Sequence, residues 1–141
     1  MTTLSPWINF NGNAEEAFGF YKSVFGGEFT KLTRFKDIAG PEFQVSEAEA
    51  YKIMQIVLPI GGGSLIGNDV PSFMGTTNEN ENRSKIHVAF DATEEAEKVF
   101  TQLSVGGQVE AAPSEGASEA YFASFRDKYG IEWIVECSPT K

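Results

Sequence analysis

The stretch NAEEAFGFYKSVFGGEF, residues 13–29, has the pattern of an amphipathic helix that ends at a glycine pair and leads into a strand. The chain repeats this phrase as TEEAEKVFTQLSVGGQV, residues 93–109, with a glycine pair at the same place. Glycine ends a helix readily because it enters the left-handed conformation without steric cost. The two phrases therefore predict an internal duplication. Apolar residues at the spacing of one helix face are Ala17, Phe20, Tyr21 and Val24 in the first copy, and Ala96, Val99, Phe100 and Leu103 in the second.

Both helices begin with a capping-box pattern. Asn13 is followed three residues later by Glu16, and Asp91 is followed three residues later by Glu94. In such a box the first side chain accepts a hydrogen bond from a free backbone N–H of the first turn. We therefore expect the side chains of Asn13 and Asp91 to cap the two helices.

The sequences that flank the two helices also match. WINF precedes the first helix as HVAF precedes the second, and three segments rich in Val, Ile, Phe and Tyr, bounded by turns, follow each helix. Each half therefore reads strand, helix, strand, strand, strand. The prediction is an α+β fold in which two βαβββ modules form one curved, mostly antiparallel sheet with helices outside and a concave face inside.

The predicted organisation is a single domain over residues 1–141. Module one covers residues 1–70, a polar, Asn-rich linker covers 71–83, and module two covers 84–141. An acidic insertion at residues 37–50 is the second long loop, and loops of such length are either functional or disordered.

Composition narrows the class of protein. A net charge of −9 argues against nucleic acid and anionic membranes as partners, because both need surplus Lys and Arg. The first ten residues show neither the basic start nor the apolar run of a signal peptide. The one cysteine, Cys137, suits a reducing compartment and falls at a position expected to be core. We therefore expect a cytoplasmic protein.

Three motifs carry a resemblance to a known family: PWINFNGNAEEAFGFYKSVFGGE at 6–28, LIGND at 65–69 and RDKYGIEWIVEC at 126–137. Together with Arg34, Phe35 and Asp37, they make the chain similar to the PhnB-like proteins of the glyoxalase/bleomycin-resistance (vicinal-oxygen-chelate) superfamily. That group is often labelled 3-demethylubiquinone-9 3-methyltransferase. The resemblance implies the paired βαβββ fold, a ligand site on the concave face and a homodimer.

The label itself receives no support from the sequence. An S-adenosylmethionine enzyme would show a glycine-rich turn between a strand and a helix. The only candidate is GGGSLIG at 61–67, which lies between two predicted strands and is expected to form a hairpin turn.

Enzymes of the superfamily hold a divalent metal through His, Gln or Glu side chains on the first and last strands of each module. Only His87 supplies such a side chain at a matching position. Its counterpart in the first module is Trp7, or Ser5 in a shifted register, and the remaining two positions fall at Ile134 and near Gly67. If a metal binds, Glu132 and Glu136 would join His87. Neither a cofactor nor a conventional metal site is expected.

Two hypotheses follow, with a weaker third. The first is a protein that binds a small, partly aromatic molecule without metal, in a pocket lined by Trp7, Asn9, Gln55, His87, Tyr121 and Phe122. The second is a metal-dependent lyase, isomerase or dioxygenase, in which His87 and Glu132 are the candidate catalytic residues. The third is the methyltransferase of the family label. A small-molecule ligand and a homodimer are the expected partners.

Overall fold

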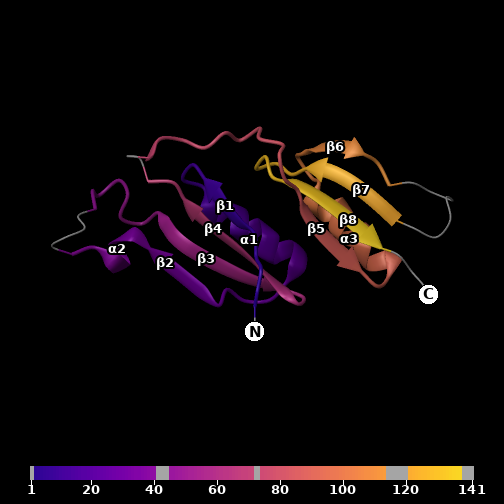
Figure 1. The fold of residues 1–141 in the computed structure, drawn as a ribbon, viewed down its shortest axis with the longest axis horizontal. Helices are drawn as coiled ribbons and strands as arrows, with labels where there is room; N and C mark the ends of the chain where they lie inside the picture. The colour runs from indigo at the N-terminus through magenta and orange to yellow at the C-terminus, as the bar shows by residue number, and fades with distance from the viewer. Residues whose placement is uncertain (1, 41–44, 72–73, 114–120, 138–141) are drawn as a thin grey trace. The chain divides into compact units, whose positions relative to one another are not determined.

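The computed structural model describes residues 2–40, 45–71, 74–113 and 121–137. The chain divides into two compact units, Met1–Thr77 and Asn78–Lys141, which are called the first and second modules below. Each module contains one four-stranded sheet (Figure 1). Among the described residues, none of the helices has the length and apolar character needed to span a membrane.

The first module follows the predicted order with one addition. Its elements are β1 (Trp7–Phe10), α1 (Ala14–Phe25), β2 (Lys31–Arg34), α2 (Phe35–Ile38), β3 (Ile53–Ile60) and β4 (Gly63–Asp69). The strand order is β1-β4-β3-β2, with β1 parallel to β4 and the other pairs antiparallel. The single turn α2 overlaps the start of the predicted insertion at residues 37–50, and residues 41–44 of that insertion lie outside the described residues.

The second module has the same topology. Its elements are β5 (Ile86–Phe90), α3 (Thr93–Leu103), β6 (Gln108–Ala111), β7 (Tyr121–Arg126) and β8 (Glu132–Cys137). The strand order is β5-β8-β7-β6, with β5 parallel to β8 and the other pairs antiparallel. The predicted duplication of a βαβββ unit is confirmed, and with it the α+β class.

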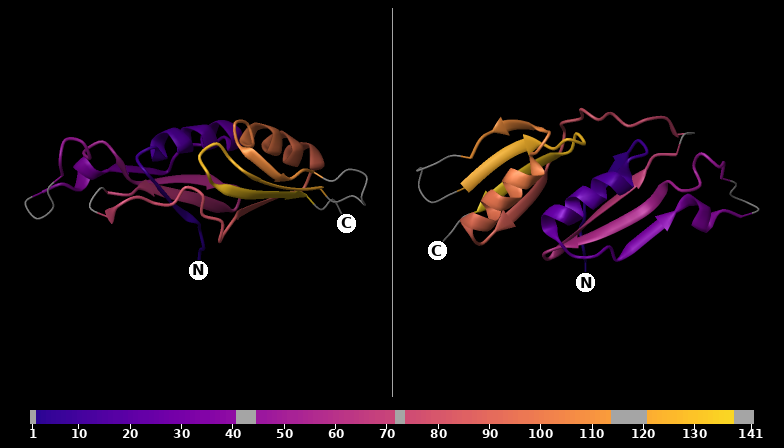
Figure 2. Two further views of the ribbon diagram at one scale, coloured as in Figure 1. Left: turned by 90° about the horizontal axis from the view of Figure 1, so that it is seen from above. Right: turned by 180° about the vertical axis from the view of Figure 1, so that it is seen from behind.

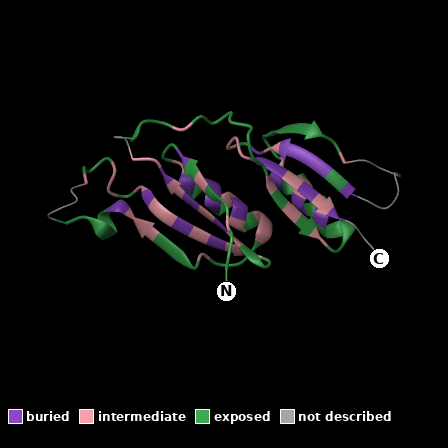
Figure 3. Ribbon diagram, in the orientation of Figure 1, coloured by how far each residue is buried: buried purple, intermediate pink, exposed green. Residues whose placement is uncertain are grey.

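In each module the helix lies across one face of the module's own sheet (Figure 2). Side chains alternate between the two faces of a strand, so buried and less buried residues alternate along β4 and β8 (Figure 3). The ring of Phe18 on α1 packs edge-on against Phe10 at 6.0 Å, and Phe100 on α3 packs edge-on against Phe125 at 5.4 Å. Among the described residues, α1 and α3 are the helices longer than one turn, and each lies on one face of its own sheet.

The buried face of α1 differs from the predicted one. Ala17 and Tyr21 are buried as expected, but Phe20 and Val24 are only half-buried, and Ala14 and Phe18 take their places in the core. Phe18 fits there because Gly67 on β4 has no side chain: a Cβ at Gly67 would lie 2.6 Å from the Phe18 ring. The face of α3 follows the prediction except for half-buried Phe100.

Both predicted capping boxes are wrong. Asn13 makes no side-chain cap hydrogen bond, and α3 begins after Ala92, also without one. At the start of α1 a distant carboxylate, that of Asp69 at the end of β4, instead accepts hydrogen bonds from the backbone of the first helical residue and of the turn before it. Its Oδ1 accepts hydrogen bonds from the backbone N–H of Gly12 at 3.1 Å and of Ala14 at 2.9 Å. Its Oδ2 accepts a third from Ile53 N–H at 2.8 Å.

The second module ends its corresponding strand with Cys137, which is buried in the core as expected and contacts the first residue of α3: Thr93 Oγ1 lies 3.7 Å from Cys137 Sγ. Asp69 and Cys137 occupy equivalent positions, because Asp69 pairs with Phe10 and Cys137 with Phe90 in the two parallel ladders. The last residue of this strand is therefore buried in both modules, but it is a carboxylate that accepts backbone hydrogen bonds in the first module and a thiol in the second.

Gly107→Ala is expected to lower the free energy of unfolding by about 3 kcal/mol, because a Cβ there would overlap the backbone oxygen of Arg126 and crowd the backbone of Asp127. Gly62→Ala is the matched control, since a Cβ at Gly62 meets no atom within 4 Å and its φ is not positive. Urea denaturation of both variants measures the difference. Equal stability of the two would show that Gly107, just before β6, does not pack tightly against this backbone.

Candidate functional site

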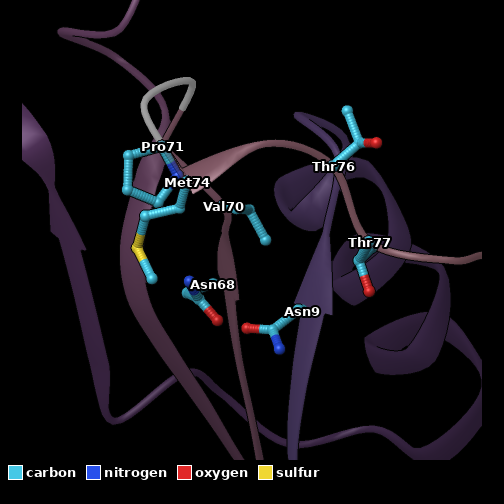
Figure 4. A pocket seen from close by; sticks show the side chains of 7 residues that line it. All are labelled: Asn9, Asn68, Val70, Pro71, Met74, Thr76 and Thr77. Atoms are coloured by element: carbon cyan, nitrogen blue, oxygen red, sulfur yellow. The ribbon is translucent and has the colours of Figure 1, made fainter.

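The candidate site lies on the face of the first module's sheet that α1 does not cover. Asn9 on β1 and Asn68 on β4 are partners in the parallel ladder, and their neighbours Phe10 and Asp69 turn inward to the core. Figure 4 shows the two asparagine side chains lying toward one another from their neighbouring strands. They form the floor of the site.

A cavity of about 240 Å³ lies above this floor. We call it the Asn9–Asn68 pocket. The chain that follows β4 supplies its walls, with Met74 on one side and Thr77 on the other (Figure 4). The lining residues are Asn9, Asn68, Val70, Pro71, Met74, Thr76 and Thr77. Among the described residues, the lining therefore combines two amides, two hydroxyls and an apolar wall, without a charged side chain.

The two asparagines differ in how far their hydrogen-bonding groups are already used. The indole N–H of Trp7 donates to Asn68 Oδ1 at 2.7 Å, and Asn68 Nδ2 donates to the backbone oxygen of Asp69 at 3.1 Å. Because an indole N–H only donates, this bond fixes which end of the Asn68 amide is oxygen. Within the described residues, the Asn9 side chain has no hydrogen-bond partner, so both its donor and its acceptor groups remain available.

Asn11 fastens the wall of the pocket to the sheet. Its Nδ2 donates to the backbone oxygen of Thr77 at 3.1 Å, and its Oδ1 accepts from Thr77 N–H at 2.8 Å. The near end of the same segment is held by Val70 N–H, which donates to Phe10 O at 2.8 Å. The chain that follows β4 is thus tied to the sheet at both Val70 and Thr77.

Asn11→Ala is expected to release this wall while leaving the module folded, because both lost hydrogen bonds are exposed. Amide hydrogen exchange at Thr77 should become about tenfold faster, in line with the loss of about 1–1.5 kcal/mol of local protection. Asn80→Ala, a change at another exposed asparagine, should leave Thr77 exchange as it is. Unchanged exchange in Asn11→Ala would show that other contacts hold the wall.

In the second module, His87 and Glu136 occupy the positions that Trp7 and Asn68 occupy in the first. His87 pairs with Ile134 in the β5–β8 ladder, as Trp7 pairs with Ile66 in the β1–β4 ladder. His87 Nε2 lies 2.7 Å from Glu136 Oε1, which reproduces the contact between Trp7 and Asn68. The side chains of His87 and Glu136 are 53% and 41% exposed, so this pair is open to solvent.

Glu132, two residues before Ile134, is held by two cations. Its side chain is 3% exposed, and it accepts from Arg126 Nη2 at 2.8 Å and from Lys85 Nζ at 3.2 Å. Lys85 also donates to Glu110 at 3.0 Å. The hydrogen bond to Glu110, followed by the one to Glu132, raises the pKa of Lys85.

These donors do not fit the divalent metal that the resemblance implies. Within the described residues, no three His, Cys, Asp or Glu side chains come together as a metal-binding group. In the part of the chain that the structure describes, Glu136 is the carboxylate in contact with His87, and both oxygens of Glu132 are taken by Lys85 and Arg126. A catalytic metal site generally uses three protein ligands.

The predicted site residues fall into three groups. Trp7, Asn9 and Gln55 are in the first module. Asn9 is part of the pocket floor, and Trp7 lies beside the floor, where it is bonded to Asn68. Gln55 lies on β3 and does not line the pocket. His87 and Phe122 are in the second module, where Phe122 pairs with Glu136 and is 40% exposed. Tyr121 is on the opposite face, buried at the helix side, and this burial raises its pKa.

Sequence reasoning missed most of the pocket wall. Met74, Thr76 and Thr77 belong to the predicted linker, and Val70 is the last residue of the predicted first module. The available signal was the pair of apolar residues, Val70 and Met74, at the start of an otherwise polar stretch. The glycine-rich stretch at 61–67 forms a hairpin turn, as predicted, because Ile60 on β3 pairs with Gly63 on β4.

A family model described as 3-demethylubiquinone-9 3-methyltransferase matches residues 2–136. Protein PA1353 from Pseudomonas aeruginosa is 28% identical, with a TM-score of 0.84 over 99% of this chain and 100% of that chain. A putative 3-demethylubiquinone-9 3-methyltransferase, PhnB protein, from Bacillus cereus is 23% identical, with a TM-score of 0.72 over 97% of this chain and 100% of that chain. A glyoxalase/bleomycin resistance protein/dioxygenase family enzyme from Burkholderia phytofirmans PsJN is 16% identical, with a TM-score of 0.59 over 94% and 95%.

Proposed function

The chain belongs to the family described as 3-demethylubiquinone-9 3-methyltransferase, the PhnB-like group of the glyoxalase/bleomycin-resistance superfamily, and from that premise we propose that its first module binds a small molecule in the Asn9–Asn68 pocket. The observation that carries the proposal is the pocket itself: about 240 Å³, with two amides on the floor and an apolar wall. Small-molecule sites typically combine apolar walls with a few placed polar groups. The volume is below the roughly 300–1,000 Å³ of drug-sized sites, so the ligand is small.

Trp7 supports a partly aromatic ligand. Its indole is 52% exposed and is anchored by its hydrogen bond to Asn68 on the pocket floor. A flat ring beside the floor would therefore meet an aromatic face as well as the polar groups, and offset stacking of two rings contributes about 0.5–1.5 kcal/mol.

Binding without a conventional metal is part of the proposal. The position predicted near Gly67 corresponds to Ile66, because Ile66 pairs with Trp7 as Ile134 pairs with His87. The four positions at which enzymes of the superfamily carry ligands therefore hold Trp7, Ile66, His87 and Ile134, and only His87 is a ligand-type side chain. Methyl transfer receives no support from the chain either, because residues 61–62 connect two antiparallel strands and do not begin a helix. The family label is therefore not carried over to this chain as an activity.

A fragment screen tests the proposal. We expect ligand-observed NMR to find small neutral aromatic compounds that bind the full chain and fail to bind Val70→Phe, in which the larger ring occupies the pocket. Val105→Phe, a matched change at an exposed position of the second module, should bind as the original does. Circular dichroism confirms that both variants are folded. Hits that bind Val70→Phe undiminished would contradict the assignment of the pocket.

The metal-dependent lyase, isomerase or dioxygenase remains a second candidate because one observation favours it: the solvent-open contact between His87 and Glu136. A metal bound only by the folded chain would raise the melting temperature by mass action. Melts with nickel, iron(II), zinc and manganese test this, with His87→Ala as the comparison. A rise that disappears in His87→Ala would favour the enzyme; no rise with any of the four would remove it.

We also propose that the chain forms a homodimer and is cytoplasmic. The four-stranded sheets end in edge strands, β1 and β2 in one module and β5 and β6 in the other. Exposed edges gain from being covered. Sedimentation velocity should give twice the mass of 15.4 kDa; a single species of monomer mass would contradict the dimer.

A further inference from the structure

The lining of the Asn9–Asn68 pocket determines the charge of the ligand it can accept. None of the seven lining residues is charged. An ionised ligand would therefore lose hydration without gaining an opposite charge, which is costly. The net charge of −9 adds a field that repels anions over a longer range. The pocket thus selects neutral ligands.

The floor determines which hydrogen-bonding groups the ligand needs. Asn68 is held by Trp7 and by the backbone oxygen of Asp69, so its amide is oriented but largely used. The Asn9 amide is directed across the floor toward Asn68 (Figure 4) and has no hydrogen-bond partner among the described residues. It offers one donor and one acceptor side by side. A ligand satisfies both only by presenting an acceptor beside a donor on one edge.

We propose that the pocket recognises a neutral planar molecule with C=O and N–H on the same edge, that is, a primary amide or a lactam. The ligand's C=O accepts from Asn9 Nδ2 and its N–H donates to Asn9 Oδ1, in the two-bond pairing that asparagine makes with adenine edges. Its apolar body lies against the wall that Val70, Pro71 and Met74 provide. This inference rests on the proposed function and names the ligand class of that same site.

Four probes that share one phenyl ring test the inference: benzamide, N,N-dimethylbenzamide, benzoate and benzamidinium. Their affinities for the full chain are measured by protein-observed NMR titration. Benzamide should bind about tenfold more tightly than each of the others, because dimethylation removes the donor N–H and the remaining two probes carry a charge.

Asn9→Asp supplies a readout that a merely structural role would not produce. Aspartate has nearly the same shape but only accepts hydrogen bonds, so the variant should reverse the preference and bind benzamidinium about tenfold more tightly than benzamide. Asn82→Asp makes the same change of charge at an exposed position outside the pocket and should leave the preference for benzamide in place.

The outcomes separate the inference from the proposed function. Equal binding of benzamide and N,N-dimethylbenzamide, stronger binding of benzoate, or an unchanged preference in Asn9→Asp would overturn the inference and leave the pocket as a ligand site. The inference would also be overturned if none of the four probes binds while the fragment screen finds compounds that bind the original chain and fail to bind Val70→Phe. Absence of binding by the probes and by every fragment would overturn the proposed function itself.

Discussion

Asp69→Ala is expected to lower the free energy of unfolding by about 4 kcal/mol, the largest effect of any single change considered for this chain. Asp69 is 1% exposed, and its carboxylate accepts three backbone hydrogen bonds, from Gly12, Ala14 and Ile53. Alanine would leave three donors without their acceptor at the start of α1 and at the start of β3. Each unsatisfied buried donor costs about 1–3 kcal/mol. Chemical denaturation followed by circular dichroism measures the loss.

Two comparisons make the Asp69 result specific. Asp69→Asn keeps one acceptor oxygen and should lose about half as much stability as Asp69→Ala. Cys137→Ala, at the equivalent position of the second module, removes a thiol that accepts no backbone hydrogen bond in the described residues and should cost about 1 kcal/mol. A loss below about 1 kcal/mol for Asp69→Ala would show that water replaces the carboxylate at these three N–H groups.

Arg126→Met is expected to cost about 3 kcal/mol, because it removes one of the two cations that hold the buried Glu132 carboxylate. Arg126 also fastens the turn before β8, since its Nη1 donates to the backbone oxygen of Gly130 at 2.6 Å. Methionine keeps most of the apolar stem and removes the charge. Denaturant unfolding of the variant measures the cost.

Lys85→Met is the control for Arg126→Met. The Lys85 side chain is 35% exposed, so its loss should cost about 1 kcal/mol or less. The double variant Arg126→Met/Glu132→Leu also removes the buried carboxylate, which Arg126→Met leaves with Lys85 as its remaining cation, and should be more stable than Arg126→Met alone. A double variant that is less stable than the single one would show that Glu132 gains its stability from Lys85 and not from Arg126.

The duplicated fold could be predicted because its signals are local and repeated. The helix phrases at 13–29 and 93–109, with their glycine pairs, predicted α1 and α3, and the apolar runs predicted every strand of the two sheets. The exchange of Phe20 for Phe18 in the core of α1 was missed because it depends on Gly67, a residue about fifty positions away that makes room for the ring.

The caps and the site depend on contacts between distant residues, which periodicity does not encode. Asp69 caps a helix that begins 55 residues earlier in the chain, so the nearby Asn13 was assigned the capping role instead. The pocket was missed in part for the same reason. Asn9 was placed on the correct face by strand alternation, but the wall around Thr77 forms only because Asn11 binds its backbone across 66 positions.

The most direct test of the account is to follow the side-chain amide signals of the ¹⁵N-labelled chain while benzamide is added. The NH₂ signals of Asn9 and Asn68 and the backbone signal of Thr77 should shift together with one binding curve, because all three residues line one pocket. The Asn9 signal is assigned by its absence in Asn9→Asp. Shifts confined to His87, Glu136 and their neighbours on β5 and β8 would contradict the account, since they would place the ligand on the second module.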